Sequence, residues 1–263
     1  MLIVCGRYAA AKDPAALAEE FQAPVPTESL SADYNVAPTK KVYVVVDRPQ
    51  EGRSIEVARW GLIPSWAKDP AIGSRMINAR VETVGSKPAF RGAFAKRRCL
   101  VPATGYYEWY TPQDGPKGKS GKPIKQPFFI HPADGSSLAM AGLYEWWRDA
   151  TRDEDDPAAW RLTCTVITTA ATDEIGRIHD RMPMTVPRAA WAQWLDPTVR
   201  LDTPEGSGDG DDTGGHGLPD LLAPATALRL EAYPVSISVN SVRNNGPSLI
   251  EPVEGELPAS SAE

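Results

Sequence analysis

The stretch Cys99–Trp109, with the sequence CLVPATGYYEW, decides the fold class of this 263-residue chain. Its run of apolar and aromatic side chains is typical of a β-strand in a core. Similar strand-like runs lie on both sides of it along the chain. They cover Val42–Val46, Ile55–Trp60, Phe128–His131, Leu138–Trp147, Trp160–Thr169 and Tyr233–Val239. The sequence is therefore rich in predicted strands.

Fewer segments are predicted to be helical. A helix is expected over residues 14–22, because Asp13 can cap its start and Pro14 suits a first turn. The other expected helices cover Lys87–Arg97, Thr172–Ile178 and Arg188–Leu195. Since helices and strands do not alternate regularly, parallel βαβ winding is disfavoured. We predict an α+β fold with a curved, mainly antiparallel, barrel-like sheet core and peripheral helices.

The composition excludes several classes of protein. No stretch approaches the run of about 18 apolar residues that a transmembrane helix needs, so we expect no membrane contact. The three cysteines and three histidines are scattered, with neither a CxxC nor an HxxxH pair. We therefore expect no metal, no cofactor and no disulfide framework. Such cysteine usage predicts a reducing compartment, the bacterial cytoplasm.

The chain is expected to form a single domain over residues 1–250. Residues 202–220 are rich in Gly and Asp and too poor in apolar side chains to pack, so they are predicted to be a loop insertion. Residues 111–126 are predicted to be a second insertion, and 251–263 a flexible acidic tail.

The charge is unevenly distributed along the chain. The net charge of −6 includes −4 in residues 149–156, −6 in 202–220 and −4 in 251–263, so the remainder carries +8. Residues 75–98 alone hold seven Lys and Arg side chains against one acidic residue. Such density occurs on solvated faces, and it is also what a phosphate backbone requires. The overall acidity therefore does not exclude nucleic acid as a partner.

Two segments and one histidine provide candidate site residues. Asn78, Arg80 and Glu82 alternate, so on a strand their side chains share one face, although a plain solvent-facing edge gives the same pattern. Glu108 lies among aromatic residues, where desolvation raises the pKa of a carboxyl and suits it to proton transfer; a salt bridge to a nearby Arg is the alternative. A lone histidine is more often structural than catalytic, but His179 lies between basic residues and just before a turn that ends in proline.

Several motifs, taken together and in order, resemble the SRAP family (SOS response-associated peptidase domain). They extend over roughly residues 5–250, and jointly they are specific. The matching segments are Cys5–Tyr8, Tyr34–Thr39, Trp60–Ala67, Asn78–Thr83, Arg98–Pro102, Gly105–Trp109, His179–Pro183, Val239–Asn240 and Arg243–Asn244.

The resemblance implies a covalent sensor and shield of abasic sites in single-stranded DNA. An N-terminal Cys5 would form a thiazolidine DNA–protein crosslink with the ring-opened sugar aldehyde. Asn78 would hydrogen-bond the adduct, and Glu108 would move protons at the amine and the sugar oxygen. His179 would assist ring opening and imine chemistry as acid or base.

A DNA-binding surface is implied as well. Arg7, Arg80 and Arg181 would bind phosphates or order the site. Trp66 and Trp109 would stack on the strand beside the lesion or block it. The expected partner is single-stranded DNA that contains abasic sites, bound by a monomer that is associated with the nucleoid while on DNA.

The chemistry of an N-terminal cysteine supports this role. Its α-amine has a pKa of about 7.7–8.0, so part of it is neutral near neutral pH and can add to an aldehyde to give an imine. The thiol of the same residue then closes a five-membered ring. Here Met1–Val4 precede Cys5, whose nitrogen is then a peptide nitrogen. We expect translation from a GTG codon at Val4 followed by Met removal, or autoproteolysis between Val4 and Cys5.

Two other functions use the same residues. A cysteine-type (auto)peptidase would employ Cys5 with Glu108 and His179, and would release at least its own N-terminal residues. A non-covalent single-strand binder or adaptor would show salt-dependent affinity without any need for Cys5. The basic run over residues 75–98 favours the two DNA functions over the peptidase. A lyase side activity at abasic sites also follows from imine formation, and closure of the thiazolidine would suppress it.

Overall fold

The computed structural model describes residues 5–112, 117–118, 120–121, 123–153, 155–171, 173–202, 216–217 and 229–255. Its strands are β1 Tyr8–Ala10, β2 Asp33–Val36, β3 Lys41–Arg48, β4 Gly52–Trp60, β5 Asn78–Arg80, β6 Arg98–Ala103, β7 Gly105–Tyr110, β8 Gln126–Pro132, β9 Leu138–Arg148, β10 Trp160–Ala170, β11 Arg181–Pro183, β12 Leu201–Asp202, β13 His216–Gly217 and β14 Leu230–Pro234. Its α-helices are α1 Pro14–Phe21, α2 Arg91–Lys96 and α3 Trp191–Leu195. Its 3-10 helices are η1 Pro70–Arg75, η2 Pro157–Ala159, η3 Asp173–Arg177, η4 Arg188–Ala190, η6 Ile237–Asn240 and η7 Pro247–Ile250.

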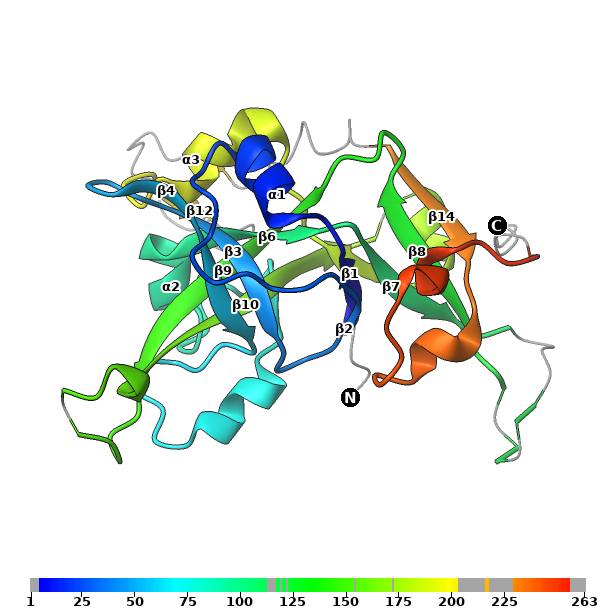
Figure 1. Ribbon diagram of the computed structural model, residues 1–263, viewed down its shortest axis with the longest axis horizontal. Helices are drawn as coiled ribbons and strands as arrows, with labels where there is room; N and C mark the ends of the chain where they lie inside the picture. The colour runs from blue at the N-terminus through cyan, green and yellow to red at the C-terminus, as the bar shows by residue number, and fades with distance from the viewer. Residues whose placement is uncertain are drawn as a thin grey trace.

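Five strands close into a barrel. They follow the order β10-β4-β3-β6-β9, and β9 pairs with β10 to complete the ring. Within this ring only the β10–β4 pairing is parallel, and β5 adds a second parallel pairing to β10 from outside it. The predicted barrel-like, mainly antiparallel core is therefore confirmed. In Figure 1 α1 and α3 lie above the barrel as peripheral helices.

A second, open sheet lies beside the barrel. Its order is β14-β8-β7-β1-β2, and all of its pairings are antiparallel. It occupies the centre and right of Figure 1, with β1 and β2 nearest the barrel. Buried side chains from both sheets form one shared hydrophobic cluster, which includes Tyr8, Trp60, Tyr106 and Val166. This cluster joins the two sheets.

The prediction of one continuous strand over Cys99–Trp109 is wrong. The chain leaves the barrel after β6, and β7 begins in the second sheet. Thr104 marks the change: its N–H donates to the Ala9 carbonyl at 2.7 Å, and its hydroxyl accepts from the Ala11 N–H at 3.0 Å. Gly105 follows where a Cβ atom would come within 2.6 Å of the Ile130 carbonyl oxygen. The segment therefore links both sheets and carries Glu108 to their junction.

The helix expected over residues 14–22 forms as α1. Asp13 caps it by accepting a hydrogen bond from the Ala15 N–H at 2.8 Å. Leu17 and Phe21 are buried on its inner face, and the Phe21 ring stacks on Trp191 with 4.5 Å between ring centres. Local capping and the spacing of apolar residues therefore suffice to form this helix.

Other expected helices and one expected strand differ from the structure. The helix expected over Lys87–Arg97 begins only at Arg91, after a series of turns that includes Pro88, which has no N–H to donate. Of the helix expected over Thr172–Ile178, the described residues Asp173–Arg177 form the 3-10 helix η3 rather than an α-helix, and Arg188–Leu195 divides into η4 and α3. The strand expected over Tyr233–Val239 ends at Pro234 and continues as η6.

Much of the two expected insertions and most of the acidic tail lie outside the described residues. Residues 113–116, 203–215, 218–220 and 256–263 are among those not described. Among the residues that the structure describes, no helix is both long enough and apolar enough to cross a membrane.

Arg98 is buried, which corrects its place in the predicted phosphate-binding run. Its guanidinium donates to five backbone carbonyls: Trp194 at 2.6 Å, Phe94 at 2.9 Å, Val199 at 3.0 Å, Ala95 at 3.3 Å, and that of Asp196. Burial lowers the pKa of the Arg98 guanidinium to about 10. Arg98 therefore ties α2 and α3 to the barrel instead of facing solvent.

We expect Arg98→Ala to lower the free energy of unfolding by about 3 kcal/mol, because it leaves several buried carbonyls without a charged donor. Chemical denaturation measures this change. Arg91→Ala, at an exposed position of α2, is the matched control and should change stability by less than about 0.5 kcal/mol. Equal unfolding midpoints for the two variants would contradict the structural role of Arg98.

Candidate active site

Cys5 and Glu108 form a buried contact at the junction of the two sheets. Cys5 precedes β1, and its N–H donates to Oε1 of Glu108 at 2.7 Å. Both residues are nearly inaccessible, with 5% and 3% of their surface exposed. Glu108 projects from β7, which pairs with β1 at Tyr8 and Ala9. Strand pairing between β1 and β7 therefore brings the cysteine nitrogen to the carboxylate.

Asn78 approaches the same cysteine from the barrel side. It begins β5, which pairs in parallel with β10 so that Asn78 lies opposite Val166. Its side-chain Nδ2 donates to the carbonyl oxygen of Cys5 at 3.4 Å. The structure thus brings together Cys5, Asn78 and Glu108, three of the four residues expected to carry the chemistry.

The segment from His179 to Arg181 approaches the thiol through the backbone of Arg181. The carbonyl oxygen of Arg181 lies 4.0 Å from Sγ of Cys5. The N–H of Arg181 donates to Nδ1 of His179 at 3.1 Å, and Oδ1 of Asp180 lies 2.9 Å from that same nitrogen. An unprotonated Nδ1 can accept from Arg181, whereas a protonated one can only pair with Asp180. The Nδ1 of His179 is therefore engaged by its own two neighbours in the sequence.

The buried setting raises the pKa of both the Cys5 thiol and the Glu108 carboxyl. Burial raises the pKa of the Glu108 carboxyl, although the hydrogen bond from Cys5 and the nearby His179 oppose that shift. Burial and the nearby Glu108 raise the pKa of the Cys5 thiol well above its usual value. The thiol is therefore protonated at rest, and Glu108 is suited to proton transfer.

Arg181 orders the site through a charged network. Its guanidinium forms two hydrogen bonds to Glu82, at 2.5 and 3.1 Å, and donates to the backbone carbonyl of Thr168 at 2.6 Å and to its hydroxyl at 3.2 Å. These bonds fix the backbone of Arg181 beside the Cys5 thiol. Of the two roles expected for Arg181, the contacts support ordering of the site.

The Arg181 contact holds the pKa of the Glu82 carboxyl below its usual value. A carboxyl whose pKa is lowered in the folded protein stabilises it above the ordinary pKa, and this stabilisation is lost as pH falls through the folded value. We expect Glu82→Gln to remove this part of the acid sensitivity, so that the unfolding midpoint falls less steeply below about pH 4. Thermal unfolding from neutral to acidic pH measures this, and equal slopes for variant and parent would contradict it.

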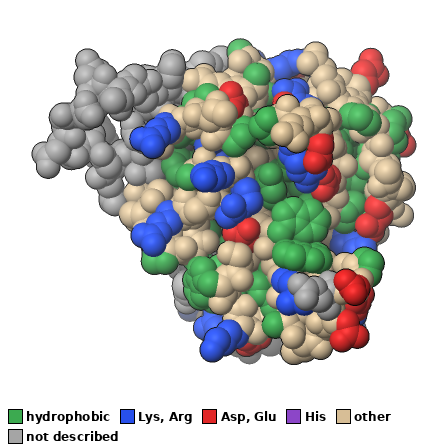
Figure 2. All heavy atoms as spheres, turned by 90° about the vertical axis from the view of Figure 1, so that its left-hand side faces the viewer, with side chains coloured by type: hydrophobic (Ala, Val, Ile, Leu, Met, Phe, Trp, Pro, Cys, Tyr) green, Lys and Arg blue, Asp and Glu red, His purple; other side chains and the backbone are tan. Residues whose placement is uncertain are grey.

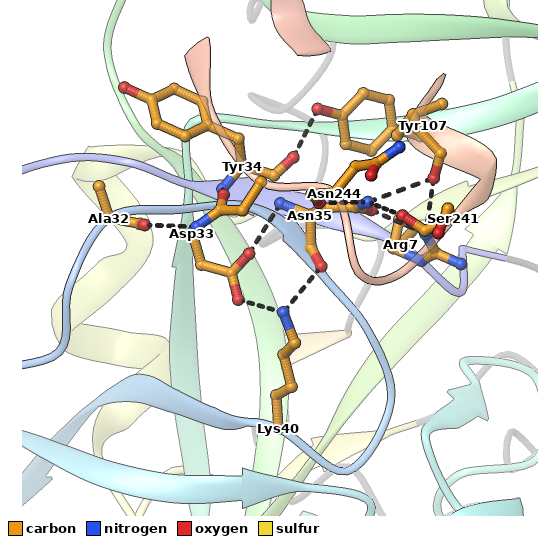
Figure 3. Close-up of polar contacts among 11 residues, drawn as sticks. Arg7, Ala32, Asp33, Tyr34, Asn35, Lys40, Tyr107, Ser241 and Asn244 are labelled. Atoms are coloured by element: carbon orange, nitrogen blue, oxygen red, sulfur yellow. Dashed lines mark hydrogen bonds and ion pairs between the residues drawn. The ribbon is translucent and has the colours of Figure 1, made fainter. Parts of the chain in front are cut away.

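Arg7 is likewise engaged within the protein. Its Nη1 donates to Oδ1 of Asn35 at 2.7 Å and to the carbonyl of Val239 at 2.9 Å (Figure 3). Its guanidinium lies 5.8 Å from the centre of the Trp109 ring, whose Nε1 donates to Oδ1 of Asn240 at 2.7 Å. Along β7 the side chains of Glu108 and Trp109 point to opposite faces. Arg7 and Trp109 therefore form a second cluster beside the reactive one.

Two predicted contact residues are exposed. Trp66 has 61% of its surface exposed, and the Trp147 Nε1 donates to the carbonyl of the next residue, Ala67, at 2.7 Å. Arg80, on β5, is exposed and forms no ion pair with any described acidic residue. Both side chains can reach a ligand from solvent, but among the described residues neither hydrogen-bonds to Cys5 or Glu108. Their roles stay predictions.

The basic run over residues 75–98 separates into exposed and engaged side chains. The exposed ones are Arg75, Arg80, Lys87, Arg91 and Lys96. Arg97 instead pairs with Glu145 at 2.7 Å. Figure 2 shows the face at the left of Figure 1, where several Lys and Arg side chains lie near one another and acidic side chains gather along the opposite edge. An uneven charge distribution of this kind can attract a phosphate backbone.

Two residues that support the site were not predicted to be functional. Thr168 is buried and anchors Arg181 from β10. Asn35 lies in the Tyr34–Thr39 motif, yet no role had been expected for it. Both act through contacts between distant segments, which local sequence patterns do not contain. Among the described residues, no group of three or more His, Cys, Asp or Glu could hold a metal ion.

Known proteins resemble this chain over nearly its whole length. It is 36% identical over 250 residues to "Abasic site processing protein YoqW" of Bacillus subtilis, covering 94% of this chain and 99% of that protein. It is 30% identical over 257 residues to "Abasic site processing protein YedK" of Escherichia coli, covering 95% and 100%. A crystal structure of a protein from Bacteroides thetaiotaomicron shares the fold, with a TM-score of 0.71, 22% identity and coverage of 95% and 100%.

The match to a protein family agrees with the motifs and the fold. The family model for SOS response associated peptidase (SRAP) matches residues 4–242. That range contains Cys5, Asn78, Glu108 and His179, together with every strand of both sheets. The chain belongs to the SRAP family.

Proposed function

We propose that this protein senses and shields abasic sites in single-stranded DNA by forming a covalent crosslink through Cys5. The observation that carries the proposal is the 2.7 Å contact between the Cys5 nitrogen and Glu108 in a buried site. The relatives are named abasic site processing proteins, in bacteria and also in chicken, where the protein named HMCES is 31% identical over 239 residues. A single domain over residues 1–250 would act as a monomer in the cytoplasm and join the nucleoid on DNA.

The first chemical step uses the α-amine of Cys5. With Cys5 as the first residue, Glu108 accepts a proton from the ammonium group and leaves a neutral amine. The amine adds to the aldehyde carbon of the ring-opened sugar, and the carbinolamine that results loses one water to become an imine. His179 gives or takes the protons of ring opening and dehydration. Asn78 hydrogen-bonds the backbone of the reacting residue.

The second step uses the thiol and traps the product. The sulfur attacks the imine carbon, the C=N electron pair moves to nitrogen, and the thiol proton passes to that nitrogen. The ring that closes is a thiazolidine, so the overall reaction joins amine, thiol and aldehyde with loss of one water. Because its pKa is raised by burial and by Glu108, the thiol is protonated at rest and is the weaker nucleophile at the start. This order of events favours amine attack first and ring closure second.

The backbone conformation of Cys5 supports a chain that begins there. Its φ angle is +47°, in the left-handed region that costs a residue with a Cβ atom about 1 kcal/mol. The φ torsion exists only while a residue precedes Cys5. Loss of the preceding residues removes both the torsion and its cost, and converts the peptide nitrogen near Glu108 into an amine.

A denaturing gel tests the proposed function. Protein beginning at Cys5 is incubated with single-stranded DNA carrying one abasic site, beside undamaged DNA and a Cys5→Ala control. The expected result is a heat-stable, slowly migrating band with the lesion only, and with Cys5 only. Absence of that band from protein whose mass shows a free Cys5 terminus would overturn the proposal.

Self-cleavage before Cys5 is the second candidate function. The left-handed backbone at Cys5 favours it, because cleavage before Cys5 removes the φ torsion and the strain that goes with it. The family description as a peptidase supports it too. Full-length protein beginning at Met1 should then convert with time to a form that begins at Cys5, and Cys5→Ala should block the conversion. A mass that stays constant over days would reject self-cleavage while leaving the crosslinking proposal open to a start codon at Val4.

A further inference from the structure

A buried asparagine joins two segments that are far apart in the sequence. Asn35, in β2, has no exposed surface. Its side-chain Nδ2 lies within hydrogen-bond distance of three carbonyl oxygens in the segment 237–245, which we call the C-terminal clasp. These are the carbonyls of Val239 at 3.2 Å, Ser241 at 2.9 Å and Asn244 at 3.0 Å (Figure 3). One side chain therefore holds both ends of the clasp.

The side-chain oxygen of Asn35 faces Arg7, which lies between Cys5 and the start of β1. It accepts from Arg7 at 2.7 Å, and the same nitrogen of Arg7 donates to the clasp at Val239. The carbonyl of Arg7 in turn accepts from the N–H of Tyr107 at 2.9 Å. The Tyr107 hydroxyl donates to the carbonyl of Tyr34 at 2.7 Å. Arg7 is thus fixed at both its side chain and its backbone.

The clasp makes a second connection to the site. Asn240 accepts a hydrogen bond from the indole of Trp109 at 2.7 Å. Trp109 directly follows Glu108 in the sequence, and Arg7 lies two residues after Cys5. The two branches that start at Asn35 therefore end on neighbours of the two residues that form the reactive contact.

The backbone of Asn35 is held as firmly as its side chain. Its N–H donates to the Asp33 carboxylate at 2.8 Å, and its carbonyl accepts from Lys40 at 3.1 Å. Lys40 and Asp33 also pair with each other at 2.6 Å (Figure 3). The amide group, the N–H and the carbonyl of the buried Asn35 are thus all hydrogen-bonded, and loss of its side-chain donor leaves several acceptors unsatisfied.

We propose that Asn35 is a positioning residue that acts through Arg7 and the C-terminal clasp to hold Cys5 against Glu108. It does not touch the reacting atoms. The inference rests on the proposed crosslinking function, and it adds that the reaction depends on a polar network on the opposite face of β7 from Glu108. A small displacement of the amine from the carboxylate is enough to slow the reaction.

Asn35→Asp tests the proposal with almost no change in shape. The carboxylate keeps an acceptor for Arg7 but places an oxygen where the donor faced three carbonyls. The crosslinking rate is measured at a series of concentrations of abasic-site DNA. We expect the maximal rate to fall about ten-fold or more, because the reactive pair is misplaced even when DNA is saturating. Thermal unfolding shows whether the variant is folded.

Asn245→Ala is the matched control for anchoring of the clasp. Asn245 also ties the clasp to β2, by accepting from the Tyr34 N–H at 2.7 Å and donating to the Ala32 carbonyl at 3.2 Å, but it does not contact Arg7. We expect its maximal rate to stay close to that of the parent. If Asn245→Ala slows the reaction as much as Asn35→Asp, any loosening of the clasp suffices, the contact of Asn35 with Arg7 has no part of its own, and the proposal is overturned.

A pair of variants at Asn240 keeps the test decisive if Asn35→Asp does not fold. Asn240 is exposed, so both variants should fold. Asn240→Ala removes the acceptor for the Trp109 indole and should lower the maximal rate, whereas Asn240→Asp retains the acceptor and should restore it. An unchanged maximal rate in Asn240→Ala, or an equal loss in Asn240→Asp, would overturn the proposal. If the parent itself forms no crosslink, the proposed function has failed instead.

Discussion

Replacing Cys5 by Ser, in protein whose chain begins at that residue, is expected to abolish the heat-stable crosslink to abasic-site DNA. Serine keeps the α-amine, so the imine still forms. Its hydroxyl closes a ring far less readily than a thiol does, and the open imine hydrolyses on heating. We therefore expect a loss of about 100-fold or more in heat-stable product, the scale at which a nucleophile matters in covalent catalysis.

Borohydride separates the two steps of this reaction. It reduces the imine to a stable secondary amine, so Cys5→Ser should give a covalent band only when borohydride is present during the reaction. Cys164→Ala, a change at a buried cysteine of β10, is the control and should leave the heat-stable band intact. A heat-stable band from Cys5→Ser without borohydride would contradict the thiazolidine.

Glu108→Gln is expected to slow crosslinking about 100-fold or more, because the amide can still accept the contact from Cys5 but cannot take its proton. The parent rate should fall as pH is lowered through the raised pKa of Glu108, where the carboxylate is lost. The variant lacks that titration, so its acidic limb should be flatter. Rates at saturating DNA across pH measure both effects, and parallel profiles would contradict proton transfer by Glu108.

The same substitution should stabilise the fold at neutral pH. Since burial raises the pKa of Glu108, the folded protein holds this proton more tightly than the unfolded chain does. The stability linked to that proton is present below the ordinary pKa of Glu and is lost as pH rises through the folded value. Glu108→Gln should therefore raise the unfolding temperature more at neutral than at acidic pH. A gain independent of pH would contradict a buried, ionised carboxylate.

Local sequence signals predicted the elements that depend on local contacts. The helix α1 was predicted because its cap at Asp13 and its apolar spacing lie within a few residues. The break at Thr104 was not, because it depends on hydrogen bonds to Ala9 and Ala11, almost a hundred residues earlier. The mainly antiparallel, barrel-like class followed from the excess of strands, but the strand pairings that close the ring did not.

The same distinction holds at the site. The motifs indicated Cys5, Asn78 and Glu108, and the structure brings these three together. Sequence alone did not distinguish exposed from buried arginines. Arg98 was therefore taken for part of a phosphate-binding run although it is 3% exposed. Asn35 was missed as a functional residue because its partners lie about two hundred residues away.

The most direct test of the central claim is the intact mass of the reaction product, followed by peptide mapping. Protein beginning at Cys5 and an oligonucleotide with one abasic site should give an adduct whose mass is the sum of the two less one water. The modified peptide should be the N-terminal one, with both the amine and the thiol of Cys5 closed to labelling. An adduct at a lysine, or no adduct from protein with a free Cys5 terminus, would contradict the account.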